Sequence, residues 1–144
     1  MWLKTIRQKI ATALGLEFMR VRVIRDSLGR PYLVRLSIFS TRWFSLKLHH
    51  ILKSDDDRAL HDHPWWFVTF ILVNGYREYT HEGEFIRKPG RIYFHKAHFA
   101  HRLELTNPAV TLVITGPTVR EWGFICKKGW EAWHKVLSRD RSEC

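Results

Sequence analysis

The segment that decides the fold runs from residue 61 to residue 75 and reads HDHPWWFVTFILVNG. His61 and His63 stand two residues apart just before an apolar run, and a turn at Asn74-Gly75 ends that run. Because side chains alternate along a strand, both imidazoles can point to one place. A pair of this kind is common by chance, so a metal site needs a third ligand from elsewhere in the chain.

The second informative segment runs from Pro89 to His101 and reads PGRIYFHKAHFAH. A Pro-Gly turn opens it, a short strand follows, and His101 stands eleven residues after Gly90. The two segments, in this order and with this internal spacing, resemble the two motifs of the cupin superfamily. His98 lies in the loop before His101 and is the competing ligand, but the register favours His101.

The resemblance implies an all-β fold: a cupin double-stranded β-helix, or jelly-roll, barrel with a divalent metal inside one mouth. His61, His63 and His101 are the implied ligands. The cupin motif usually supplies a glutamate four or five residues after the second histidine, where this chain has Phe67 and Val68. The site is therefore similar to that of the cupins related to cysteine dioxygenase, in which three neutral imidazoles hold Fe(II).

Imidazole ligands do not identify the metal, so Zn, Ni, Mn and Cu remain alternatives to Fe(II). The competing interpretation is a barrel that has lost its metal and keeps the histidines as hydrogen-bonding residues.

The rest of the chain is consistent with one cupin domain spanning residues 1–144. Residues 1–16 have apolar side chains at helical spacing and predict an amphipathic helix. Residues 17–126 contain many short alternating runs separated by turn residues, which is typical of a β-barrel. Residues 127–144 predict a short C-terminal helix over 130–137 and a polar tail.

Composition sets the expected partners and compartment. The formal charge of +10 favours anionic partners, including a small anionic substrate or nucleic acid, although no nucleic-acid-binding motif is present. Cys126 and Cys144 are far apart in sequence and predict neither a disulfide framework nor a thiolate metal site, which suits the cytoplasm. The sequence has no transmembrane segment, and the basic N-terminal helix is expected to cover a barrel edge or to touch a membrane.

Arg58, Trp65 and Arg120 are the predicted substrate-binding residues. A guanidinium at position 58 could reach the barrel mouth and bind a carboxylate or phosphate. Arg120 could do the same, although an Arg–Glu pair with Glu121 that secures the last strand is the competing interpretation. Asp62 is expected to be a solvated loop carboxylate, and Asp55-Asp56-Asp57 a polar turn.

The run after His63 is apolar on both faces. Trp65, Phe67, Thr69 and Ile71 are expected to face inward, while the residues between them face outward. A second sheet or a partner subunit must cover the outward face, so a homodimer is a further prediction.

These observations favour a mononuclear non-haem Fe(II) oxygenase or dioxygenase acting on a small anionic substrate. The alternatives are a cupin isomerase or epimerase of a sugar nucleotide that works by acid–base chemistry, and a non-catalytic barrel that binds a ligand or nucleic acid.

Overall fold

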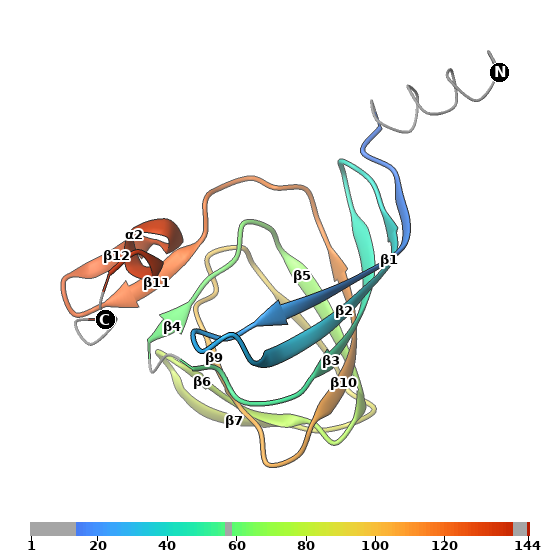
Figure 1. Ribbon diagram of the computed structural model, residues 1–144. Helices are drawn as coiled ribbons and strands as arrows, with labels where there is room; N and C mark the ends of the chain where they lie inside the picture. Colours follow the sequence, from blue (N-terminus) through green and yellow to red (C-terminus); the bar gives the residue numbers. More distant parts are fainter. Residues whose placement is uncertain (1–13, 57–58, 140–143) are drawn as a thin grey trace, which may run out of the picture.

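The computed structural model describes residues 14–56, 59–139 and 144, which are mostly strand (Figure 1). A six-stranded antiparallel sheet has the order β1-β2-β3-β10-β5-β8, and a three-stranded sheet with the order β7-β6-β9 lies opposite. The strands of the first sheet are β1 (Glu17–Arg25), β2 (Pro31–Ser40), β3 (Ser45–Ile51), β10 (Ala109–Thr115), β5 (Phe67–Val73) and β8 (Ile92–His95). Those of the second are β7 (Gly83–Arg87), β6 (Tyr76–Thr80) and β9 (Arg102–Glu104).

The turn at Asn74-Gly75 carries the chain from one sheet to the other. Both residues have positive φ, and a Cβ on Gly75 would lie 2.2 Å from the carbonyl oxygen of Arg87, so only glycine fits there. The motif spacing predicts that this turn closes a hairpin, but β5 pairs with β10 and β8, whereas β6 pairs with β7 and β9. Splitting the strands of each motif between two sheets is what closes the barrel.

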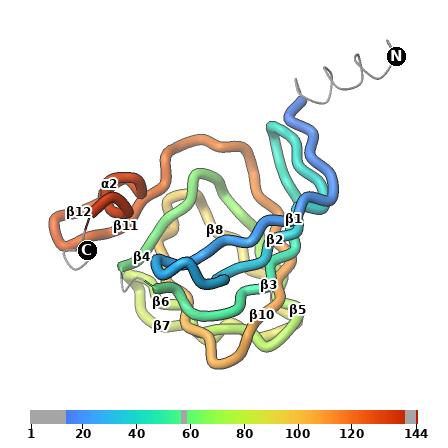
Figure 2. Tube along the Cα trace, in the orientation of Figure 1, coloured from blue at the N-terminus to red at the C-terminus, as the bar shows by residue number. Residues whose placement is uncertain are grey.

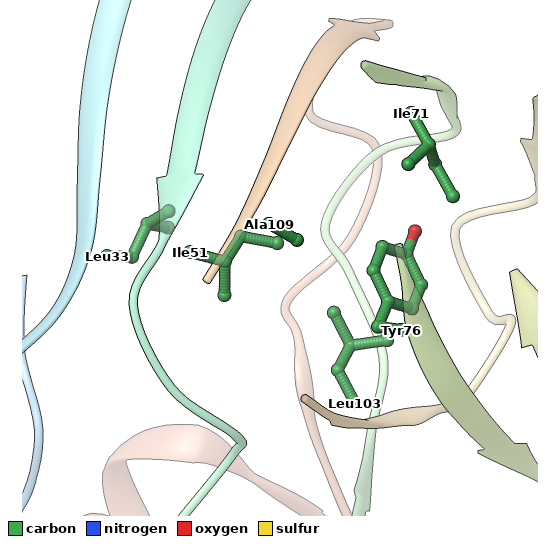
Figure 3. Close-up of a cluster of buried hydrophobic side chains, with 6 residues drawn as sticks. All are labelled: Leu33, Ile51, Ile71, Tyr76, Leu103 and Ala109. Carbon is green, nitrogen blue, oxygen red and sulfur yellow. The ribbon is translucent and has the colours of Figure 1, made fainter. Parts of the chain in front are cut away.

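The hydrophobic core lies between these two sheets. Residues from both sheets pack together there, as Figure 3 shows: Leu33, Ile51, Ile71, Tyr76, Leu103 and Ala109. The expected alternation in β5 is confirmed, since Phe67, Thr69 and Ile71 are buried and the residues between them are more exposed. The barrel interior thus contains both an apolar core and the polar site described below.

A separate C-terminal unit lies beside the barrel, and Figure 2 shows it at the end of the chain trace. β11 (Gly123–Cys126) pairs with β12 (Gly129–Ala132) and with β4 (Leu60–His61), and α2 (Trp133–Leu137) follows. The predicted short helix is confirmed over its second half. Its first half is a strand instead, because the turn before Gly129 lets residues 129–132 pair with β11.

One cysteine prediction is wrong. Cys126 and Cys144 form a disulfide, with their Cα atoms 4.2 Å apart, because β12 and α2 fold back and return the chain end to β11. Eighteen residues of sequence separation concealed this proximity.

Two further expectations concern surfaces. The predicted N-terminal helix falls almost entirely on residues 1–13, outside the described residues. The outward face of the six-stranded sheet exposes apolar side chains, including Leu72, Ile92 and Phe94, so the homodimer stays a prediction. In the described part of the chain, no helix has the length and apolar character needed to cross a membrane.

Candidate metal centre

A backbone bridge brings the two histidine segments together. The amide of His61 donates to the carbonyl of His101 at 2.9 Å, and the amide of His101 donates back to the carbonyl of His61 at 2.9 Å. Directly opposite residues in an antiparallel pair project to the same side. The bridge therefore aims both imidazoles into the barrel, from segments 40 positions apart in the sequence.

His63 completes the cluster because it follows His61 by two residues. Its amide donates to the carbonyl of Ala97 at 3.0 Å, which fixes the chain just after β4. The Nε2 atoms of His63 and His101 are 2.8 Å apart, and one nitrogen from each of the three histidines lies within 4.8 Å of the others. Two nitrogens bound at right angles to one metal at ~2.1 Å would be ~3 Å apart, so the cluster has the size of a three-imidazole metal site.

Glu78 on β6 orients His101. Its Oε1 accepts a hydrogen bond from Nδ1 of His101 at 2.5 Å, and its Oε2 accepts from Nε of Arg87 at 2.6 Å. The carboxylate is fully buried. Burial by itself would raise the pKa of Glu78, but the hydrogen bond and charge of His101 lower it, so the group is ionised. With Nδ1 carrying the proton, His101 presents the lone pair of Nε2 to the other histidines.

Asp55 lies near His61 at a longer distance, beyond that of a hydrogen bond. Its Oδ2 lies 3.7 Å from Nδ1 of His61 and also accepts a hydrogen bond from the amide of Leu103 at 2.7 Å. Its Oδ1 accepts from the hydroxyl of Tyr32. Asp55 is therefore part of the site's support and not only a member of the predicted polar turn.

The surroundings of His63 favour its neutral form. Burial, followed by the charges of His101 and His61, holds the pKa of His63 well below its usual range. Metal ligation requires a deprotonated nitrogen, so His63 has no proton to lose at neutral pH. The donor set, its spacing and its two supporting carboxylates fit a divalent metal.

The three histidines line one wall of a cavity of about 490 Å³. Trp65 stacks on His63 with ring centroids 5.1 Å apart, and Phe67 meets the same ring edge-on. Apolar and aromatic side chains form most of the remaining wall, with a few polar groups among them. This composition is typical of a site for a small organic ligand.

The other predicted site residues lie in different places. Trp65 lines the cavity beside His63, so its predicted substrate contact remains possible to test there. Arg58 lies outside the described residues. Arg120 donates to Asp62 at 2.5 Å and stands over the ring of Trp130, so its charge is used within the C-terminal unit.

Two expectations about neighbouring side chains have clear outcomes. Asp62 is not solvated: it is 2% exposed and also accepts from the amide of Gly123 at 2.7 Å and from Nε1 of Trp130 at 2.9 Å. Alternation turns it away from the imidazoles and into the C-terminal unit. His98 is exposed, as expected, and is not part of the cluster.

Sequence reasoning missed Glu78. The available signal was a lone carboxylate at an inward position of a strand, between the buried Tyr76 and the partly buried Thr80. Nothing in the sequence indicated that this position would face His101.

We expect Glu78→Gln to weaken metal binding about 10- to 100-fold, as loss of a carboxylate behind a histidine ligand commonly does. The amide cannot hold the Nδ1 proton of His101 as an ionised carboxylate does. Titration with a divalent metal would measure the change, with Glu84→Gln as the control, because Glu84 makes an exposed pair with Arg77. A folded Glu78→Gln protein with unchanged metal affinity would show that the carboxylate has no part in orienting the ligand.

Comparison with known proteins gives one informative result. No protein-family profile matches the sequence, and no curated protein sequence matches it. Solved structures do match. A cupin-2 domain from Rhodospirillum rubrum has a TM-score of 0.61 at 10% identity, covering 88% of this chain and 84% of that one. An RmlC-like cupin from Shewanella frigidimarina has a TM-score of 0.54 at 15% identity, covering 71% and 87%.

A third similar structure is that of HppE in its Fe(II) form, with a TM-score of 0.55 at 16% identity. The match covers 70% of this chain and 60% of HppE. At these identities the comparisons report the fold alone. The chain therefore has the cupin fold.

Proposed function

We propose that this chain is a metal-dependent cupin enzyme, a mononuclear non-haem Fe(II) oxygenase that acts on a small anionic substrate. The observation that carries the proposal is the cluster of His61, His63 and His101 at the wall of a cavity, which no carboxylate joins among the described residues. Three protein ligands leave positions open for other molecules, which is what metal catalysis requires. The Fe(II)-containing HppE, which shares the fold, supports iron among the metals that imidazole accepts.

The chain's own residues would have two tasks in this reaction. Glu78 and Asp55 hold the orientation of His101 and His61. Trp65 and Phe67 exclude water from the face of His63. A bound Fe(II) would supply the redox chemistry with O2 that amino-acid side chains lack. A dioxygenation that places both oxygen atoms in the product balances without an external reductant.

The acid–base isomerase has weaker support. Two tyrosines, Tyr32 and Tyr76, line the cavity and are the natural acid–base groups there. Burial is the largest cause that raises the pKa of each one, and the charges of Asp55 and Glu78 respectively add to it. A tyrosine with a raised pKa is a poor base at neutral pH, so these residues suit support of the wall better than proton abstraction.

Oxygen consumption tests the proposal. The protein is purified without chelator, its metal content is measured by mass spectrometry, and the anaerobic apoprotein is reloaded with Fe(II). O2 uptake is then followed with a panel of small carboxylic acids. We expect uptake that requires Fe(II) and one class of acid, is lost in His63→Ala, and persists in His98→Ala, whose side chain is exposed.

Chelation separates the alternatives. Turnover of any substrate that survives exhaustive chelation would contradict the oxygenase and favour the isomerase. Steeply salt-dependent binding of DNA or RNA, with no metal bound, would favour the non-catalytic barrel.

A further inference from the structure

The inner face of the six-stranded sheet carries a row of basic side chains. The register places Arg22 opposite Arg35, Arg35 opposite His49, and His49 opposite Thr111. Lys47 lies two residues from His49 on the same strand and therefore on the same face. Arg35, His49 and Thr111 all line the cavity that the three metal-binding histidines line.

Arg35 differs from the other enclosed arginines in its partners. Arg87 and Arg120 each pair with a buried carboxylate, Glu78 and Asp62 respectively. Within residues 14–56 and 59–139, the Arg35 side chain makes one hydrogen bond, from Nε to Nε2 of His49 at 3.1 Å, and no ion pair within 4.0 Å. Its two terminal amino groups have no acceptor among the described residues, and Arg35 lines the cavity.

His49 orients the guanidinium without neutralising it. Burial, then the charges of Arg35 and Lys47, lowers the pKa of His49 to about 3, so the ring is neutral and accepts from Nε of Arg35. With Nε held, the edge formed by Nη1 and Nη2 is the free edge of the guanidinium, and this edge matches the two oxygens of a carboxylate.

Placing this cation here has a cost in the folded state. Burying a charge without a partner is unfavourable. Burial is also the main reason that the pKa of Lys47 falls to about 8, with the charges of Arg35 and Arg22 adding to it. Glu17 is the acid whose charge acts on Lys47, and it already pairs with Arg20 and Arg22. An unpaired, costly charge at a cavity wall is the usual arrangement of a binding group.

We propose that Arg35, oriented by His49, binds the carboxylate of a small carboxylic acid whose other end reaches the three-histidine site. The wall of the same cavity includes Leu33, Ile51, Phe67 and Val113, which suits a short apolar or aromatic skeleton. One guanidinium edge matches a carboxylate monoanion, whereas a phosphate dianion calls for more donors. The reacting end rests on the proposed function; the carboxylate site does not.

Binding measurements on the metal-free full-length protein test this site. The probes are benzoate, hexanoate and inorganic phosphate, and benzamide is the neutral counterpart of benzoate. Isothermal titration calorimetry measures the binding of each one. We expect at least one carboxylate to bind at millimolar concentration, with affinity about 10-fold or more weaker in Arg35→Met and intermediate in Arg35→Lys, because lysine keeps the charge and loses the fork. Arg91→Met, which removes an exposed cation, should match the wild type.

The unfolding temperature provides a second measurement, which distinguishes a binding role of Arg35 from a purely structural one. Because the charge of Arg35 has no ion-pair partner in the described part of the chain, Arg35→Met should unfold at the same temperature as the wild type or higher. The inference would be overturned if Arg35→Met kept its carboxylate affinity, or if it lost benzamide binding as much as benzoate binding. It would also be overturned if the wild type bound phosphate more tightly than benzoate, or bound no carboxylate.

The metal content separates this inference from the proposed function. Arg35→Met should bind metal as the wild type does. A wild-type protein that binds no metal but loses benzoate with Arg35 would refute the oxygenase and leave the carboxylate site standing.

Discussion

His101→Ala is expected to lower metal affinity on the order of 100- to 1,000-fold, since each ligand of a structural metal site contributes roughly 3 to 4 kcal/mol. His101 has the most complete support in the cluster: a backbone bridge to His61, an Nδ1–H held by Glu78, and an Nε2 atom 2.8 Å from that of His63. Its removal takes away one ligand and the residue that links the other two to the second sheet.

Calorimetric titration with Co(II) or anaerobic Fe(II) would measure this loss. Because the variant also leaves Glu78 without its histidine partner, its unfolding temperature is measured without metal to confirm that the barrel is intact. His98→Ala removes an exposed imidazole three residues away and should leave the affinity unchanged. An affinity in folded His101→Ala within a few-fold of wild type would remove His101 from the ligand set.

Asp62→Asn is expected to destabilise the protein by about 3 kcal/mol or more, because it leaves a partly buried guanidinium without its counter-charge. The carboxylate of Asp62 is almost fully buried and accepts from Arg120, the amide of Gly123 and the indole of Trp130. An amide keeps the shape but gives up one acceptor oxygen and the charge. The loss should also loosen the C-terminal unit from the segment that carries His61 and His63.

Urea unfolding monitored by fluorescence gives this free energy as a shift of the midpoint at constant slope. Glu121→Gln is the matched control, because Glu121 pairs with His134 at the surface, where such pairs contribute about 1 kcal/mol or less. If Asp62→Asn unfolds at the same urea concentration as Glu121→Gln, the three contacts are not what holds the C-terminal unit.

The features that the sequence predicted are local ones. Alternation along residues 67–71 predicted which side chains are buried, and the spacing of His61 and His63 predicted a shared direction. The Pro-Gly turn and its distance to His101 predicted that a third imidazole would arrive at the same mouth. Each of these predictions depends on residues that are close in the sequence, or on the spacing within one motif.

The features that the sequence did not predict depend on pairing across sheets. Glu78 meets His101 because β6 pairs with β9, and Arg35 meets His49 because β2 pairs with β3. A shift of one residue in either register would turn those side chains to the opposite face. The Cys126–Cys144 disulfide likewise depends on the β11–β12 hairpin. The sequence had placed most of the second strand of this hairpin in the predicted helix over residues 130–137.

X-ray absorption spectroscopy of the iron-loaded protein tests the central claim most directly. We predict one iron per chain, bound by three imidazole nitrogens at about 2.1 Å, with the imidazole signal reduced in His61→Ala. Iron that binds with no imidazole signal, or a protein that retains no metal after reconstitution, would contradict it.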